Sequence, residues 1–118
     1  MVTLTRNIFD VVSGHAAESL RAFSREVHGA LPGRVVRVVL FGSRARGDAR
    51  RDSDYDVAVF VTGLADRRSV DHMLSDIAYP HILQGVHIRP IAIPSEYLAP
   101  LGQHPLVDRI VREGIAVS

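Results

Sequence analysis

The residues best suited to chemistry lie together in residues 41–56, FGSRARGDARRDSDYD. Gly42 and Ser43 stand where an apolar run ends and a turn or short helix begins. Glycine allows a ligand to approach the backbone closely, and the free amides at the start of a helix attract phosphate. The Ser43 hydroxyl could add one hydrogen bond. Gly-Ser is a common dipeptide, so on its own it is better interpreted as an ordinary strand-to-helix turn.

Two aspartates, Asp54 and Asp56, lie two residues apart where the next apolar run opens. On a β-strand such residues point to one face, with Cα atoms about 6.5–7 Å apart. Neighbouring carboxylates repel each other unless a cation lies between them, and Mg²⁺ takes carboxylates together with substrate phosphates. At a fully exposed strand end they would instead be harmless solvated charges. The pair alone does not decide between these interpretations.

The combination is more specific than its parts. The segment FGSRARGDARRDSDYDVAVFV resembles the signature of the nucleotidyltransferase superfamily that includes DNA polymerase β. Within it the chain is similar to the minimal nucleotidyltransferases, which are single small domains. IAIPSEYL and HPLVDRIVREGIAV near the end of the chain resemble a subgroup of small bacterial members. The fold implied is the polymerase β-like nucleotidyltransferase fold.

The resemblance also implies roles for individual residues. Asp54 and Asp56 would be the catalytic residues and the ligands of Mg²⁺. The reaction would transfer a nucleoside monophosphate, most simply AMP from ATP, to a hydroxyl group of an acceptor. The residues assigned to the nucleotide and its phosphates are Gly42, Ser43, Arg44 and Ser53.

One acid of the family pattern is missing. Active members usually carry a third carboxylate on the third strand, where it acts as base, metal ligand or both. No Asp or Glu lies between Asp76 and Glu96, and the expected position falls on Pro90. The adjacent Arg89 is expected to face the other way, as is His87. The sequence therefore predicts a weakened second metal site and leaves catalysis open.

Charge argues against a general nucleic-acid binder. The 118 residues carry 14 basic and 13 acidic side chains, a net charge of +1, and every basic residue is arginine. Without lysine or cysteine, the chain has no Schiff-base lysine, disulfide, thiolate zinc site or cysteine nucleophile. Four arginines border the proposed phosphate site, and one or two of them are expected to contact phosphate or a partner: Arg44, Arg46, Arg50 and Arg51. The alternative is a solvated loop balanced by Asp48 and Asp52.

The flanking patterns predict one α/β domain, residues 1–118, with the order α-β-β-α-β-α and helices packed on a small mixed sheet. Residues 1–13 are ambiguous. Strands are expected at 35–41, 54–62 and 86–93, and the short link between the first two favours an antiparallel pair. Helices are expected at about 15–31, after Ser13 as N-cap, from Asp66 to about Leu83, and at 105–114. Pro80 should end or kink the second helix, and Pro90 indicates an edge strand or a bulge.

Two functions remain open. The first is AMP transfer from Mg-ATP, with the acceptor on a helical HEPN-type toxin that this chain would neutralise as antitoxin, because the family's small members often occur in such pairs. The second is a catalytically impaired protein that neutralises or regulates a partner by binding alone. A structural role that uses neither Gly42-Ser43 nor the Asp pair ranks last. A cytoplasmic location is expected, with no membrane span, and the edge of the third strand would permit a homodimer.

Overall fold

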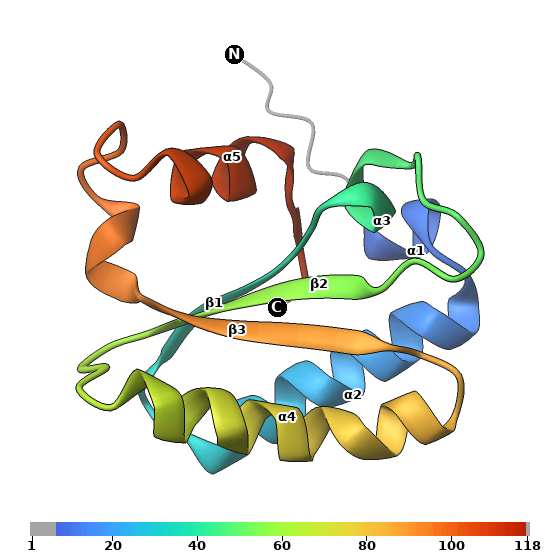
Figure 1. Ribbon diagram of the computed structural model, residues 1–118, viewed down its shortest axis with the longest axis horizontal. Coiled ribbons are helices and arrows are strands. Elements are labelled where there is room, and N and C mark those ends of the chain that lie inside the picture. The colour runs from blue at the N-terminus through green and yellow to red at the C-terminus, as the bar shows by residue number, and fades with distance from the viewer. Residues whose placement is uncertain (1–6, 118) are drawn as a thin grey trace.

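The computed structural model describes residues 7–117 (Figure 1). Two elements were not predicted, a short first helix and a two-residue last strand. In chain order the elements are α1 Ile8–Val11, α2 Gly14–Ala30, β1 Val35–Phe41, α3 Ser43–Arg46, β2 Tyr55–Val61, α4 Arg67–Leu83, β3 Ile88–Pro94, the 3₁₀ helix η1 Ser95–Leu98, α5 Pro105–Glu113 and β4 Ile115–Ala116. The α-β-β-α-β-α order is thus roughly confirmed.

The four strands form one mixed sheet in the order β3-β2-β1-β4. The predicted antiparallel pairing of β1 with β2 is confirmed, and Phe41 lies opposite Asp56 at the end of that ladder. β2 and β3 are parallel, because α4 carries the chain back across the sheet before β3 begins. The sheet therefore brings the C-terminal end of β1 and the N-terminal ends of β2 and β3 together at one end of the strands.

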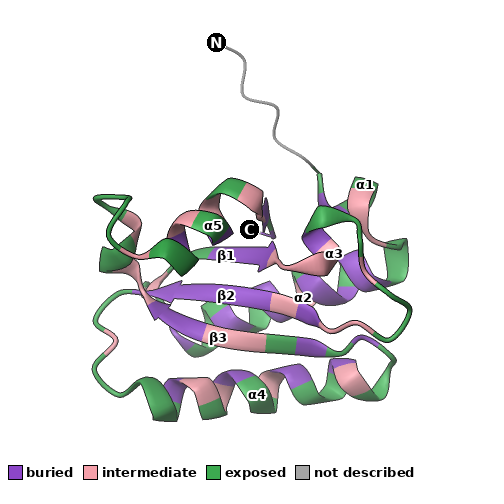
Figure 2. Ribbon diagram, turned by 45° about the horizontal axis from the view of Figure 1, so that its top comes forward, coloured by how far each residue is buried: buried purple, intermediate pink, exposed green. Residues whose placement is uncertain are grey.

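Both faces of the sheet are covered, as Figure 1 shows: α2 and α4 lie on one face and α5 on the other. β2 is buried on both sides (Figure 2), with Val57, Val59 and Val61 in the core under α2 and α4. Ala58 and Phe60 belong to the second core under α5. Since side chains alternate along a strand, Asp56 belongs to the α5 face of the sheet.

The helix boundaries follow local signals. The Ser13 hydroxyl accepts a hydrogen bond from the Ala16 amide at 3.2 Å, and the Asp66 carboxylate accepts one from the Ser69 amide at 3.1 Å. α4 runs past Pro80 to Leu83, where the helix was expected to end, so Pro80 does not terminate it. Pro80 lies on the exposed side, where water can satisfy the carbonyl that loses its intrahelical partner.

β3 begins two residues later than predicted and lies at an edge of the sheet, as Pro90 indicated. The Ala92 amide points away from β2 and donates to Asp71 Oδ1 on α4 at 2.7 Å. Pro90 and Pro94 are two residues before and after Ala92, so their nitrogen atoms are also on the side away from β2, and neither has an N–H to donate.

Across the part of the chain that the structure describes, no helix is long and apolar enough to cross a membrane.

Candidate active site

The backbone of Gly42 forms one wall of the site. Gly42 joins β1 to α3 with φ 76° and ψ −156°, a conformation that is essentially limited to glycine. A Cβ atom built at this position would lie 2.7 Å from Asp56 Oδ2. Glycine is therefore required twice, by the backbone conformation and by the closeness of the carboxylate. Ser43 follows directly as the first residue of α3.

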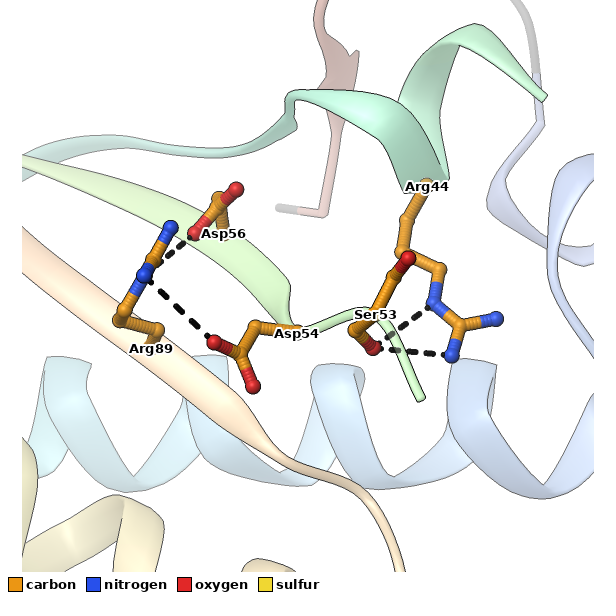
Figure 3. A network of polar contacts seen from close by, with 5 residues as sticks. All are labelled: Arg44, Ser53, Asp54, Asp56 and Arg89. Carbon is orange, nitrogen blue, oxygen red and sulfur yellow. Dashed lines mark hydrogen bonds and ion pairs between the residues drawn. The ribbon is translucent and has the colours of Figure 1, made fainter. Parts of the chain in front are cut away.

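Asp54 and Asp56 share one cation, the guanidinium group of Arg89 (Figure 3). Arg89 Nε donates to Asp56 Oδ1 at 2.8 Å, and Arg89 Nη1 lies 3.5 Å from Asp54 Oδ2. The side chains of Asp54 and Asp56 are 42% and 18% exposed, whereas that of Arg89 is 66% exposed. The two carboxylates thus lie at the start of β2, and the guanidinium that pairs with them is on their solvent side.

Pro90 was expected beside the two aspartates, with Arg89 facing the other way, and the observed pairing of β3 with β2 shows that this is wrong. Asp56 lies beside Arg89, and Pro90 lies beside Val57. Arg89 shares its face of β3 with Ile91 and Ile93, which pack in the core under α5, so it points to the same side as Asp56. The position where the family's third carboxylate is expected therefore holds Arg89, a positive charge, and not Pro90.

The Arg89 guanidinium is a permanent charge. Its hydrogen bond to Asp56, and the negative charges of Asp56 and then Asp54, raise its pKa above the usual value, although partial burial acts in the opposite direction. Arginine is already protonated throughout the range in which proteins fold. Asp54, Asp56 and Arg89 together therefore carry one net negative charge.

Arg44 and Ser53 lie on the other side of Asp54 (Figure 3). Arg44 Nε and Nη2 donate to the Ser53 carbonyl at 3.2 and 2.9 Å, and Nη2 also donates to the Arg51 carbonyl at 3.2 Å. The guanidinium lies 4.3 Å from the centre of the ring of Tyr55, which is buried in the core. Arg44 therefore stabilises the loop that precedes Asp54. The expected contact of Arg44 with phosphate stays a prediction.

Other polar groups of the loop are also engaged in holding it. The Ser53 hydroxyl accepts a hydrogen bond from the Arg50 amide at 2.8 Å, and its contact with phosphate likewise stays a prediction. Arg46 pairs with Asp48 at 3.2 Å and approaches Glu113 of α5 at 3.9 Å. Of the four arginines of this stretch, Arg46 therefore pairs with an aspartate of the loop and Arg44 with carbonyls of the loop.

The site offers oxygen ligands for a metal ion, but few of them. Among residues 7–117 there is no cluster of three His, Cys, Asp or Glu side chains suited to a metal. Two carboxylates fit one Mg²⁺ ion held jointly with substrate phosphates, since magnesium commonly keeps only one or two protein carboxylates. Arg89 contacts one oxygen of each carboxylate, Oδ2 of Asp54 and Oδ1 of Asp56.

Comparison with known proteins identifies the family. The sequence model of the nucleotidyltransferase domain matches residues 20–115. The chain belongs to the nucleotidyltransferase domain family. The match includes the whole of the Gly42-Ser43 turn, Asp54 and Asp56, and β3 with Arg89.

Two relatives agree with this assignment. A protein of Methanocaldococcus jannaschii named "Putative protein adenylyltransferase" is 36% identical over 79 residues, 65% of this chain. The alignment spans 54% of that relative, about half of its length. The crystal structure of a protein of Sulfolobus solfataricus, described as a putative nucleotidyltransferase, has a TM-score of 0.59 at 21% identity. The structural match covers 89% of this chain and 87% of the Sulfolobus chain. At 21% identity, this match supports the fold alone.

Arg89 is the residue of the site that sequence reasoning did not place. Its signal was present in the apolar alternation of β3, where Ile88 and Ala92 pack in the core under α2 and α4. Ile91 and Ile93 pack in the other core, so odd-numbered residues share the face of Asp56. The alternation puts Arg89 on the face of Asp56, and the observed register then makes it the neighbour of that carboxylate.

Proposed function

We propose that this domain transfers AMP from ATP to a hydroxyl group on a partner protein. The observation that carries the proposal is the closeness of Asp56 to Gly42, where an added Cβ would lie 2.7 Å from Oδ2, because it brings the start of α3 to the acidic pair. The name of the archaeal relative, a protein adenylyltransferase, supports a protein as the acceptor.

The residues would divide the work as follows. Gly42 has no side chain to keep a triphosphate away from the backbone, and Ser43 offers a hydroxyl as the first residue of α3. Asp54 and Asp56 would hold Mg²⁺, which stabilises the negative charge that develops on departing pyrophosphate. The acceptor oxygen would attack the α-phosphorus, and the bond from that phosphorus to the oxygen that bridges it to the β-phosphate would break, so that pyrophosphate leaves. The proton of the acceptor hydroxyl would pass to water.

The site favours an acceptor that gives up its proton readily. The usual third carboxylate, a candidate base, is replaced by Arg89 at the register position beside Asp56. A tyrosine hydroxyl has a pKa of about 10, so it needs less help from a base than an aliphatic hydroxyl does. The resemblance to small members of the family that occur in toxin–antitoxin pairs implies a helical HEPN-type toxin as the partner, with a tyrosine as the acceptor, and this domain would be its antitoxin.

Intact-mass analysis tests the proposal. The chain and a HEPN-type partner protein are incubated with Mg-ATP, and the expected result is one added AMP on the partner. Asp54→Asn should abolish the addition. Asp52→Asn is the matched control, because Asp52 is an exposed aspartate of the same loop, and it should leave the addition unchanged. Loss of the addition in both variants, or in neither, would contradict the assigned site.

A second function is favoured by one observation, the arginine where a third acid is expected. Under it, the domain neutralises its partner by binding alone. The same samples distinguish the two: a stable complex with no added mass, unchanged by Asp54→Asn together with Asp56→Asn, would identify a binding protein.

A further inference from the structure

We infer that Arg89 is the resident cation of the Asp54–Asp56 pair in the nucleotide-free protein and keeps a free metal ion out of it. The inference concerns the free protein and holds whether or not AMP is transferred. It rests on the geometry of three side chains from two adjacent parallel strands and the loop before them.

The electrostatic reason is local. Two carboxylates on one side of a sheet edge repel each other and need a positive charge between them. Arg89 supplies it through two different nitrogens, Nε to Asp56 and Nη1 to Asp54 (Figure 3). A metal ion arriving alone would have to compete with Arg89 for both carboxylates, and would lie beside a guanidinium of like charge.

The backbone of Arg89 is held in the sheet, whereas its guanidinium group is exposed to solvent. Arg89 is fixed at its backbone by the register that places it beside Asp56, and its neighbours Ile91 and Ile93 are packed under α5. Its guanidinium end is exposed, so it can leave the carboxylates without disturbing either core. A nucleoside triphosphate brings anionic oxygens that a displaced guanidinium can bind in a bidentate manner. Metal entry is therefore expected to be easier with the nucleotide than without it.

Mn²⁺ binding to the nucleotide-free protein tests the inference, with the metal detected by its electron paramagnetic resonance signal. Arg89→Ala is expected to bind Mn²⁺ about tenfold more tightly than the unaltered protein, or better, which corresponds to about 1.4 kcal/mol. Arg89→Lys keeps the charge but loses the forked donor, so its affinity should lie between the two. Arg37→Ala, at an exposed arginine of β1, is the matched control and should change nothing.

A second readout is thermal unfolding, which needs no catalysis. Addition of Mg²⁺ should raise the melting temperature of Arg89→Ala and leave that of the unaltered protein and of Arg37→Ala unchanged, since only a bound ion stabilises the folded state. Arg89→Asp, which adds a third carboxylate beside Asp56, should respond most strongly. Equal Mn²⁺ affinity in the unaltered protein and Arg89→Ala would overturn the inference.

Repeating the titration with a non-hydrolysable ATP analogue separates this inference from the proposed function. The difference between the unaltered protein and Arg89→Ala should shrink when the analogue is present. If the difference persists, Arg89 still excludes the metal as inferred, and it is metal-dependent AMP transfer by the unaltered protein that is contradicted.

Discussion

Gly42→Ala should destabilise the protein through two separable effects. The first is backbone strain, because φ 76° and ψ −156° cost a residue with a Cβ about 1–3 kcal/mol. The second is the clash with Asp56 Oδ2 at 2.7 Å. That oxygen must move away, which disturbs an ion pair worth about 0.2–1 kcal/mol on an exposed arginine. The free energy of unfolding should therefore fall by about 1–4 kcal/mol.

Urea unfolding followed by circular dichroism measures the loss, and a double-mutant cycle isolates the clash. Asp56→Ala removes the atom that the new methyl group meets, so Gly42→Ala should cost less in that background. The coupling between the two positions should exceed about 0.5 kcal/mol. Gly47→Ala is the control: Gly47 also has a positive φ, 85°, but a Cβ there meets nothing within 4 Å.

Gly47→Ala should cost about 1–2 kcal/mol from strain alone, equally in both backgrounds. The reasoning fails if Gly42→Ala and Asp56→Ala are additive within about 0.3 kcal/mol. Additivity would mean that the Gly42 backbone and the Asp56 carboxylate do not constrain one another, and the site would lose the contact that defines it.

Two further predictions concern the supports of the site. Arg44→Ala removes the bonds to the carbonyls of Ser53 and Arg51, so it should lower the free energy of unfolding by about 1–3 kcal/mol and speed tryptic cleavage of the loop. Arg44→Lys should recover little of this, and full recovery would show that charge alone matters. Asp71→Ala leaves the Ala92 amide without its acceptor and should cost about 1–3 kcal/mol in urea unfolding, whereas Asp71→Asn keeps an oxygen there and should cost clearly less.

Local sequence signals predicted much of the fold because they act over a few residues. Ser13 and Asp66 cap the helices that they were expected to cap. The apolar runs became β1 and β2, and the short link between them favoured the antiparallel pair that the structure shows. α1 and β4 escaped prediction because four and two residues are too few to show a periodicity.

The register of β3 could not be predicted in the same way. β2 and β3 are separated by the 17 residues of α4, and nothing within either strand specifies which residues become neighbours. The register is set by packing, through the two cores that receive alternate residues of β3. The Gly42-Ser43 turn and the two aspartates were correctly placed together, whereas the cation between the aspartates emerged only from this packing.

The prolines of β3 have a consequence for how this chain can meet another protein. A strand that joins a sheet at its border needs both donors and acceptors along that border. On the outer side of β3, Pro90 and Pro94 have no N–H, the Ala92 amide is bound to Asp71, and the Ile88 amide is bound to the Val86 carbonyl. Carbonyls remain there but no donor does, so β3 is closed to strand addition. A partner protein, or a second copy of this chain, would have to recognise side chains on the surface rather than extend the sheet at β3.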